Sequence, residues 1–402
     1  MRSPTEEHFT EASRLLADVR DIVDERPDGA SPPGWCERRG WTRFLAGLTD
    51  EAVLSAERDG LAAHLATLPE TPDDLRALAR AVTHWTALPM ADAASTEAVD
   101  RRRASPRKRV QVAAFAGLVE RLGGTAARVV DIGSGHGHLT RHLARALGVE
   151  AEGWERDPAR VAVAAALAGD GGARFVTIDA RDAAAALRRT DLVVGLHACG
   201  ALGDDAVRAA GAAGASVAII GCCLQKRDGD RAALAVPGGV SAASLTIGRA
   251  VLGLGNACDG EEGVEEALAV RAASRVNRMA LRAALLAAGL SVEVGEEMRG
   301  VNRRRATGTL ADLVDCACAA RGVAAPSAAA VAAAGLSAAA AYEALRRWAL
   351  PRAMLARLVE VWVALDRAAW LRGRGYATEV LVAFDAAVSP RNVAVLGWPG
   401  PT

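Results

Sequence analysis

The amino-acid sequence predicts an α/β protein built on a parallel β-sheet that helices cover on both faces. Five short apolar runs occur between residues 127 and 223, separated by alanine-rich or helical segments: ARVVDIG, AEGWERD, ARFVTIDARD, DLVVGLHACG and ASVAIIGCC. Apolar runs of this length are typical of strands buried on both faces, and their alternation with helical segments is typical of parallel sheets. We therefore expect these runs to form strands one to five.

Helical segments are expected on both sides of this strand series. Residues 1–100 contain apolar residues at helical spacing, and the segment TPDDLRALARAV opens with a capping threonine and acidic first-turn residues. Residues 230–350 are rich in alanine and arginine, and only SVEVGEE has the pattern of a short strand. We interpret the first region as an N-terminal helical region and the second as a helical insertion.

The C-terminal segment completes the predicted sheet. LARLVEVWVALDRAAWLRGRG predicts an amphipathic helix that ends at Gly373 or Gly375, and TEVLVAFD and VAVLGW predict two strands that pair antiparallel at one edge. The expected regions are a helical region at 1–100, a core with strands one to five at 101–229, a helical insertion at 230–350, and a closing helix with strands six and seven at 351–402.

Composition narrows the classes of partner. Forty-eight basic residues balance 48 acidic residues, so the net charge does not demand a nucleic acid or a membrane. We recognise no signal peptide and no uncharged apolar stretch long enough to span a bilayer, and we expect the seven cysteines to be reduced thiols. The expectation is a cytoplasmic protein without a membrane partner.

The stretch VVDIGSGHGHLTRHLARALGVEAEGWERD contains the first chemical motif. Strand one is expected to end at Asp131, and the turn GSGHG at 133–137 leads into a helix. Glycines let the backbone turn tightly and let a ligand come close, and the amides at the helix start favour electron-rich ligand atoms. The third glycine falls one residue earlier than in the dinucleotide fingerprint G-x-G-x-x-G. A G-x-G-x-G turn after an acid resembles the S-adenosyl-L-methionine turn of the class I methyltransferases.

Two acids at later strand ends support a nucleotide-type ligand. Glu155 ends strand two, where its carboxylate can accept hydrogen bonds from ribose hydroxyls, and Asp179 ends strand three, where it can accept the adenine amino group beside the backbone of Ala180. The resemblance places the acid at Asp131 near the methionine end. The residues expected to bind S-adenosyl-L-methionine are Asp131, Gly133, Ser134, Gly135, Gly137, Glu155, Asp179 and Ala180.

The three histidines of this stretch do not predict a metal site. His138 and His142 share a helix face, but no glutamate follows His138 as a zinc-binding helix of the H-E-x-x-H type would require. We expect these two and His136 to be solvated or loosely packed. No metal is expected.

The ends of strands four and five carry the candidate catalytic residues. LHACG at 196–200 and GCCLQK at 221–226 should meet at the carboxyl edge of the sheet, where ligands bind. His197 could position or deprotonate a substrate or could bond the cofactor, and Cys199, Cys222 and Cys223 could act covalently or pack as small apolar groups. Lys108, one of two lysines in an arginine-rich chain, marks a further cation. Catalytic roles are predicted for His197, Cys199 and Lys108.

Several motifs resemble one group of methyltransferases. SPRKR, DIGSGHGHL, GLHACGAL, GCCLQK, LDRAAWL and FDAAVSPRN occur in the order of that group, whose eukaryotic members include methyltransferase-like protein 25 and the glutathione S-transferase C-terminal domain-containing protein. The resemblance implies a seven-strand class I methyltransferase sheet, Rossmann-like, and dependence on S-adenosyl-L-methionine. It does not supply a substrate. Arg107 departs from the lysine of the group, and Ala201 from the acid that often follows the glycine.

The acceptor is left open between classes. RNA is favoured because basic residues lie beside the expected cleft and in a second cluster: Arg101, Arg102, Arg103, Arg107, Lys108 and Arg109, then Arg299, Arg303, Arg304 and Arg305. Such runs also occur as solvated faces. A small molecule or a protein side chain is the alternative acceptor. A protein that binds S-adenosyl-L-methionine without turnover is the alternative of another class.

Overall fold

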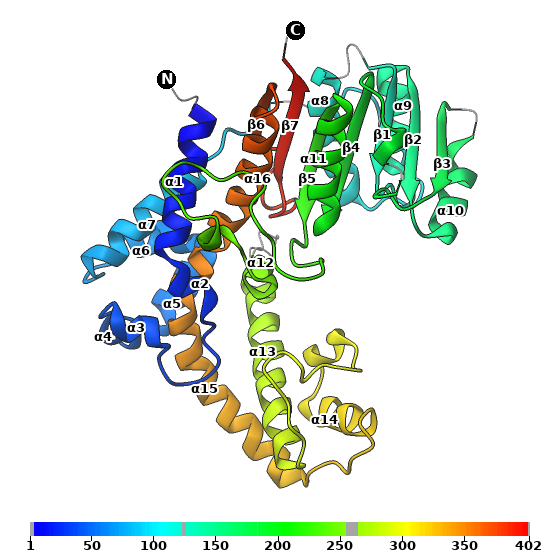
Figure 1. Cartoon of the computed structure of the whole chain (residues 1–402). Helices are drawn as coiled ribbons and strands as arrows, with labels where there is room; N and C mark the ends of the chain where they lie inside the picture. The colour runs from blue at the N-terminus through cyan, green and yellow to red at the C-terminus, as the bar shows by residue number, and fades with distance from the viewer. Residues whose placement is uncertain are drawn as a thin grey trace. The chain divides into compact units, whose positions relative to one another are not determined.

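The chain forms two compact units in the computed structural model, which describes residues 4–92, 94–122, 126–169, 171–182, 184–254 and 264–400 (Figure 1). Unit 1 comprises Met1–Arg20, Ala81–Glu261 and Leu355–Thr402, and unit 2 comprises Asp21–Arg80 and Glu262–Met354. This division differs from the four regions expected from the sequence. The region expected at 1–100 contributes to both units, and so does the region expected at 230–350.

Unit 1 contains a seven-stranded sheet in the order β3-β2-β1-β4-β5-β7-β6. Strands β1 to β5 pair in parallel, and β7 runs antiparallel to both of its neighbours. The seven-strand class I methyltransferase sheet and its antiparallel closing pair are thereby confirmed. The strands are β1 (Arg128–Ile132), β2 (Glu150–Glu155), β3 (Ala173–Thr177), β4 (Asp191–Cys199), β5 (Ser216–Cys222), β6 (Tyr376–Val382) and β7 (Val393–Pro399).

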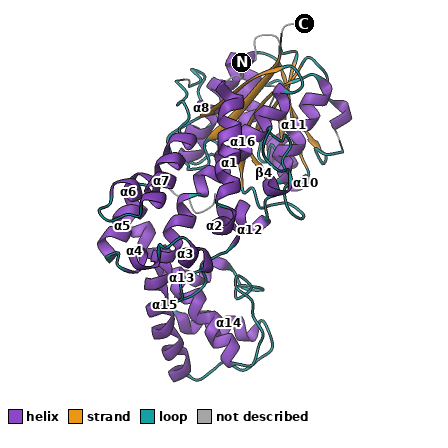
Figure 2. Ribbon diagram, turned by 60° about the vertical axis from the view of Figure 1, so that its left-hand side comes forward, coloured by secondary structure: helices purple, strands orange, loops and turns teal. Residues whose placement is uncertain are grey.

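Helices cover both faces of this sheet, and Figure 2 shows the strands as one layer among them. Alternate strand residues enter different apolar clusters, because successive side chains point to opposite faces. Val129 packs in the cluster with α8 and α9, and Val130 packs in the cluster with α11. The helices of unit 1 are α1 (Pro4–Asp18), α8 (Pro106–Leu122), α9 (His138–Leu147), α10 (Pro158–Ala168), α11 (Ala201–Ala213), α12 (Arg249–Leu252) and α16 (Ala356–Arg372), with 3-10 turns η2 (Ala184–Ala186) and η3 (Ala243–Leu245).

Local sequence signals explain where these helices begin. The Ser105 hydroxyl accepts the backbone N–H of Lys108 at 3.2 Å, and Pro106 occupies the first position of α8, which requires no N–H donor. Asp157 and Pro158 open α10 in the same manner. The expected closing helix is α16, which ends at Arg372 with Gly373 as its cap.

Unit 2 is helical in its described part, and two segments distant in sequence make it. Arg346 forms an ion pair with Glu57 at 2.5 Å, and the Trp348 indole donates to the carbonyl of Ala30 at 2.9 Å. These contacts join residues 21–80 to residues 262–354, which explains why the sequence regions do not coincide with the units. Its helices are α3 (Gly34–Arg38), α4 (Thr42–Ala46), α5 (Asp50–Asp59), α6 (Leu61–Thr67), α13 (Val264–Ala287), α14 (Leu310–Ala319) and α15 (Ala328–Met354), with η5 (Arg303–Thr307), whereas α2 (Arg20–Asp24) and α7 (Asp73–Thr86) cross the unit boundary.

One sequence expectation about residues 230–350 needs correction. SVEVGEE at 291–297 forms loop and turns rather than a strand. One helical stretch, Ala328–Arg372, is long and apolar enough to cross a membrane by length and composition, with 11% of its most apolar window buried. Its apolar character comes largely from alanine, whose methyl group offers little area for burial. Length and composition alone are weak evidence for a membrane span.

A buried ion cluster connects the elements behind the carboxyl edge of the sheet. Asp204 of α11 accepts hydrogen bonds from Arg227, Arg231 and Arg367 at 2.9–3.0 Å, and Arg231 also pairs with Asp366 at 2.7 Å. Burial would raise the pKa of Asp204, but these arginines hold it below its ordinary value. The cluster therefore ties α11 and α16 to the segment that follows β5.

Asp204→Asn should destabilise unit 1 by about 3 kcal/mol or more, because it removes the carboxylate that pairs with the buried Arg231 and Arg367 and with the partly buried Arg227. Urea denaturation at neutral pH measures the loss. Asp205→Asn, at the next position of α11, is the matched control and should not destabilise unit 1, because burial and the neighbouring Asp204 carboxylate raise the pKa of Asp205. Equal effects of the two substitutions would contradict the role given to Asp204.

Candidate functional site

In the glycine turn between β1 and α9, one glycine packs closely against a side chain and another borders an open space. All three glycines have left-handed φ angles of +71°, +56° and +70° at Gly133, Gly135 and Gly137, which favour glycine. A Cβ at Gly137 would overlap the ring of Phe175. A Cβ at Gly135 would meet no atom within 4 Å. Gly137 is therefore required for packing, whereas Gly135 borders space that a ligand can occupy.

Glu155, at the end of β2, lies against this turn. Its carboxylate accepts the backbone N–H of Gly135 and the backbone N–H of Asp157, each at 3.1 Å. Each carboxylate oxygen has a second lone pair available for a ribose hydroxyl. The structure thus brings Glu155 and Gly135 together, as the spacing in the sequence predicts.

The turn also contains a polar group that lacks a partner. The Ser134 hydroxyl oxygen is buried and makes no hydrogen bond to a described residue. Buried hydroxyls normally have a partner, so this oxygen fits a ligand group. Ser134, the open space at Gly135 and the Glu155 carboxylate together fit the nucleoside part of S-adenosyl-L-methionine.

Asp131 occupies the middle of the carboxyl edge. It is 2% exposed and accepts a 2.6 Å hydrogen bond from the Thr140 hydroxyl. Burial raises the pKa of Asp131 to about 6, while Thr140 and the nearby Lys108 act in the opposite direction. A cationic ligand group beside this carboxyl would stabilise its ionised form. The strand continues one residue beyond Asp131, to Ile132.

Asp179 lies in the turn after β3, which ends two residues earlier than expected, at Thr177. Its carboxylate accepts hydrogen bonds from the backbone and side chain of Arg181, which lower its pKa to about 2. Adenine would have to displace the Arg181 side chain, and an ion pair this exposed is weak. Ala180 follows in the same turn and packs against the apolar cluster on this face.

The histidines near the turn are more buried than the sequence indicates. His142 is fully buried and bonds the Ser95 hydroxyl at 3.0 Å, and His138 is 8% exposed beside Arg141. Burial lowers the pKa of His138 to about 4. The expectation of solvated or loosely packed rings is therefore wrong for these two, because α9 turns both toward neighbouring elements; His136 is exposed.

A β-bulge places His197 at the end of β4. The pairing of β4 with β5 shifts between Leu196 and Ala198, and His197 adopts φ +70°, which is rare for a residue with a side chain. Its Nε2 lies 3.0 Å from Oε1 of Gln111 on α8. Burial lowers the pKa of His197 to about 4, and the cations Lys108, Arg107 and Arg391 add to this effect. The ring is therefore neutral at pH 7.

The cysteines of β4 and β5 form one cluster. The Sγ atoms of Cys199 and Cys222 are 3.0 Å apart, and with Cys223 all three lie within 4.8 Å of one another. The hydrogen bond between these two sulfurs lowers the pKa of Cys199 and raises that of Cys222. Lys226 lowers the Cys199 pKa further, as its place in the sequence suggests.

Lys108 lies in the first turn of α8 and faces this edge. It interacts electrostatically with Asp131 and Cys222, and burial lowers its pKa. The positive charge of Lys108 also lowers the pKa of His197. The structure therefore brings together the three predicted catalytic residues, Lys108, His197 and Cys199, at the carboxyl ends of β1, β4 and β5.

The other basic residues fall into separate units. Arg101, Arg102 and Arg103 are exposed in unit 1, where Arg102 pairs with Asp100 at 2.7 Å. The second sequence cluster belongs to unit 2, and its members are exposed: Arg299, Arg303, Arg304 and Arg305.

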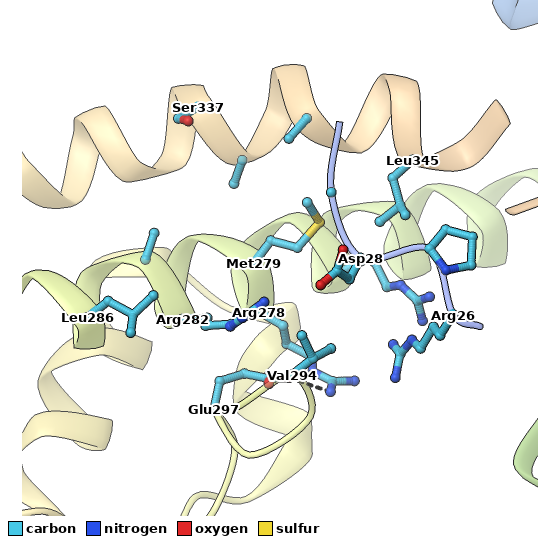
Figure 3. A pocket seen from close by; sticks show the side chains of 16 residues that line it. Arg26, Asp28, Arg278, Met279, Arg282, Leu286, Val294, Glu297, Ser337 and Leu345 are labelled. Carbon is cyan, nitrogen blue, oxygen red and sulfur yellow. Dashed lines mark hydrogen bonds and ion pairs between the residues drawn. The ribbon is translucent and has the colours of Figure 1, made fainter. Parts of the chain in front are cut away.

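Unit 2 also contains an arginine-lined cavity of about 330 Å³, shown in Figure 3. Arg278 pairs with Glu297, whereas Arg26 and Arg275 make no hydrogen bond or ion pair with a described residue. Arg282 donates to the carbonyl of Val292 at 3.2 Å. Apolar side chains complete the wall: Met279, Leu286, Val294 and Leu345. The free guanidinium groups favour an anionic ligand with an apolar part.

Three further residues support the site and are not among those expected from the sequence. Gln111 orients His197, Thr140 bonds Asp131, and Arg141 donates to the carbonyl of His136 at 2.7 Å within the glycine turn. Gln111 had one available signal, because it is a polar residue inside the apolar helix VQVAAFAGLV. Thr140 and Arg141 belong to an ordinary helical pattern that does not reveal their partners.

Comparison with known proteins supports a methyltransferase domain. Residues 107–228 match the family model described as "Methyltransferase domain", which agrees with the strand order of unit 1. No curated protein matches the chain. The match includes the glycine turn and the cysteine cluster and covers less than half of the chain.

Three solved structures illustrate the likeness of this chain to known proteins. An RNA methyltransferase from Salinibacter ruber with S-adenosyl-L-homocysteine is 20% identical over 31% of this chain and 84% of its own, with a TM-score of 0.24. TrmN from Thermus thermophilus is 24% identical over 29% and 42%, with a TM-score of 0.24. The plantazolicin methyltransferase BpumL is 14% identical over 44% and 62%, also at 0.24. TM-scores of this size carry no argument about the acceptor.

Asp131→Asn should stabilise the ligand-free protein at pH 7.5. Since burial raises the pKa of Asp131 from 3.8 to about 6, its protonated form is favoured in the folded state. Its stabilising effect is complete below pH 3.8 and is lost as the pH rises through 6, a change of about 3 kcal/mol. Asparagine stays neutral and can still accept from Thr140.

Urea denaturation between pH 4.5 and 8 checks this prediction, with the difference between variant and wild type growing as the pH rises. The charged groups facing Asp131 are Lys108 from α8 and Glu155 from β2. Asp179→Asn is the control, since the pKa of that carboxyl is lowered, and it should not stabilise at pH 7.5. A less stable Asp131→Asn variant at pH 7.5 would refute the argument.

Proposed function

We propose that this chain is an S-adenosyl-L-methionine-dependent methyltransferase of the group that includes methyltransferase-like protein 25, with RNA as its acceptor. The observation that carries the proposal is the open space at Gly135, whose backbone N–H donates to the Glu155 carboxylate, in a turn that also holds the unpartnered Ser134 hydroxyl. This space borders the carboxyl edge of a class I sheet, where Asp131, His197 and Lys108 also lie. The methyltransferase-domain match of residues 107–228 supports it.

The residues of this edge divide the work of binding. Glu155 accepts hydrogen bonds from the ribose hydroxyls, and Gly135 leaves room for the nucleoside. Asp179 accepts a hydrogen bond from the adenine amino group once the Arg181 side chain rotates away, and Ala180 lies beside the adenine. Asp131 faces the cationic methionine end. When bound, S-adenosyl-L-methionine supplies a methyl group activated by its sulfonium.

The remaining residues position the acceptor. With its Nε2 donating to Gln111, the neutral His197 leaves Nδ1 free to accept a proton or a hydrogen bond from the acceptor. A histidine of such low pKa is a weak base, so its role is chiefly orientation. Lys108, partly desolvated, supplies a positive charge for an anionic group of the acceptor. Proximity then contributes much of the acceleration.

RNA fits the distribution of arginines better than a neutral acceptor does. α8 begins with Arg107, Lys108 and Arg109 and has no acid in its first turn, although cations are unfavourable at the positive end of a helix. An anionic partner compensates for this arrangement. In unit 2 the unpaired Arg26 and Arg275 of the cavity can hold a phosphate, and the apolar wall can pack a base.

Gly135→Ala should weaken the binding of S-adenosyl-L-methionine at least tenfold, or about 1.4 kcal/mol, because the methyl group enters the ligand space. Gly148→Ala is the matched control. Gly148 also has a left-handed φ, +65°, with no atom within 4 Å of an added Cβ, but it ends α9 away from the turn. Calorimetry with S-adenosyl-L-methionine and with NAD decides between the two ligands. Tight NAD binding, or equal effects of both alanines, would reject the cofactor assignment.

Lys108→Ala should lower methyl transfer and reduce the salt dependence of RNA binding by about one phosphate contact. Arg121→Ala removes a cation from the exposed last turn of α8 and should change neither quantity. Radiolabelled methyl transfer into fractionated RNA, protein and small molecules identifies the acceptor class.

A separate pair of substitutions tests whether the cavity of unit 2 binds RNA. Arg26→Ala with Arg275→Ala should weaken RNA binding while leaving calorimetric binding of S-adenosyl-L-methionine unchanged. Label in protein or metabolites instead of RNA would contradict the RNA proposal and retain the methyltransferase. Cofactor binding without transfer to any fraction would contradict the enzyme.

A further inference from the structure

The geometry points to a zinc site formed by Cys199, Cys222 and Cys223. Among the described residues, this is the one group of three metal-ligating side chains whose ligand atoms lie within 4.8 Å of one another. The site is separate from the glycine turn, so its existence does not depend on methyl transfer. It would bind Zn²⁺ or another thiolate-preferring ion.

Two strained backbone positions bring these sulfurs together. Without the bulge at His197, continued pairing from Leu196 and Ile220 would set Cys199 opposite Cys223; with the bulge, Cys199 pairs with Cys222. Consecutive strand residues point to opposite faces, but Cys223 adopts φ +43° and so leaves the strand pattern. His197 and Cys223 are thus two non-glycine residues with left-handed φ angles. Cys223 belongs to the cluster, and His197 lies two residues before Cys199. Such strain persists where the surrounding structure requires the geometry.

A tight backbone contact holds the two cysteine segments against each other. A Cβ at Gly200 would overlap the carbonyl oxygen of Lys226, so only glycine fits there. The N–H of Gly200 donates to the carbonyl of Cys222 at 3.1 Å, and the N–H of Ala201 donates to the carbonyl of Lys226 at 3.3 Å. The thiols are therefore held by rigid backbone rather than by a loose loop.

The distances suit zinc after small side-chain rotations. A Zn–S bond of about 2.3 Å in a tetrahedral site puts two sulfurs about 3.8 Å apart. The sulfurs of Cys199 and Cys222 are 3.0 Å apart, closer than that value, and all three sulfurs lie within 4.8 Å of one another. Cys199 and Cys223 are half-buried, which leaves a path for the ion. Three protein ligands leave the fourth position for water or an acceptor atom.

The positively charged residues near the three cysteines favour zinc binding. Zn²⁺ with three thiolates carries one net negative charge. The sequence has two lysines against 46 arginines, and both lie near the cluster: Lys226 interacts electrostatically with Cys199, and Lys108 with Cys222. Binding requires three thiolates, releases to solvent the protons that the thiols still hold, and transfers no electrons.

Zinc binding is tested on the full-length reduced protein with zinc chloride alone, followed by dialysis and elemental analysis. We expect about one zinc per chain. Cobalt substitution should give thiolate-to-metal charge-transfer absorption and the visible bands of a tetrahedral site. This spectrum uses the unaltered chain, so the test holds even if a cysteine variant fails to fold.

Cys199→Ser, Cys222→Ser and Cys223→Ser should each weaken zinc binding by more than about tenfold, a loss that even an outer-shell partner can cause. Cys316→Ser is the matched control, because Cys316 is half-buried like Cys199 but belongs to unit 2. Its zinc content should stay at the wild-type value.

Three results would overturn the zinc site. These are absence of retained zinc, equal zinc in all four variants, and a Cys199–Cys222 disulfide, seen as the loss of two hydrogens by mass spectrometry, that forms in place of metal binding. Calorimetry with S-adenosyl-L-methionine on the same samples separates this outcome from failure of the proposed function. Cofactor binding without zinc rejects the metal alone, and zinc without cofactor binding rejects the methyltransferase alone.

Discussion

The Asp204 carboxylate holds the functional edge of unit 1 in place. Three arginines from two other segments, the partly buried Arg227 and the buried Arg231 and Arg367, converge on it. Arg367 fits between Gly203 and Gly221, where an added Cβ would lie 2.6 and 2.7 Å from its guanidinium. α11 follows β4 directly and Arg227 follows the end of β5, so this cluster fixes the two strand ends that carry the thiols and His197. A buried charge cluster is costly to desolvate, but once formed it tolerates few alternative arrangements.

Strain at the edge depends on that support. His197 and Cys223 occupy a backbone region that side chains rarely adopt, and neither residue would stay there in an unsupported loop. The bonds from Gln111 to the His197 ring and from Cys222 and Lys226 to the Gly200 segment hold the geometry. The same strain places the His197 ring against Gln111 and gathers three sulfurs, so the proposed orientation of an acceptor and the proposed metal binding have one structural origin.

Desolvation sets the charge states at this edge. Burial keeps His197 neutral, raises the pKa of Asp131 toward neutrality and lowers the pKa of Lys108. A cationic ligand would favour the ionised carboxylate of Asp131, so cofactor binding and proton release should be linked. The ligand-free protein is therefore less stable at neutral pH than its packing alone would allow, which is a common feature of binding sites.

The sequence by itself determined the seven strands, the glycine turn, the position of Glu155 and the meeting of His197 with the cysteines of strands four and five, because strand alternation and glycine spacing are local properties. The tertiary structure brought Lys108 to the same edge. Only the tertiary structure decided the division into two units, the burial of His138 and His142, and the partners of Asp204 and His197. Those depend on contacts between distant segments, such as Arg346 with Glu57. The sulfur cluster was determined partly by the sequence and partly by the tertiary structure. The sequence places the cysteines at strand ends, but a one-residue shift in register decides which of them face each other.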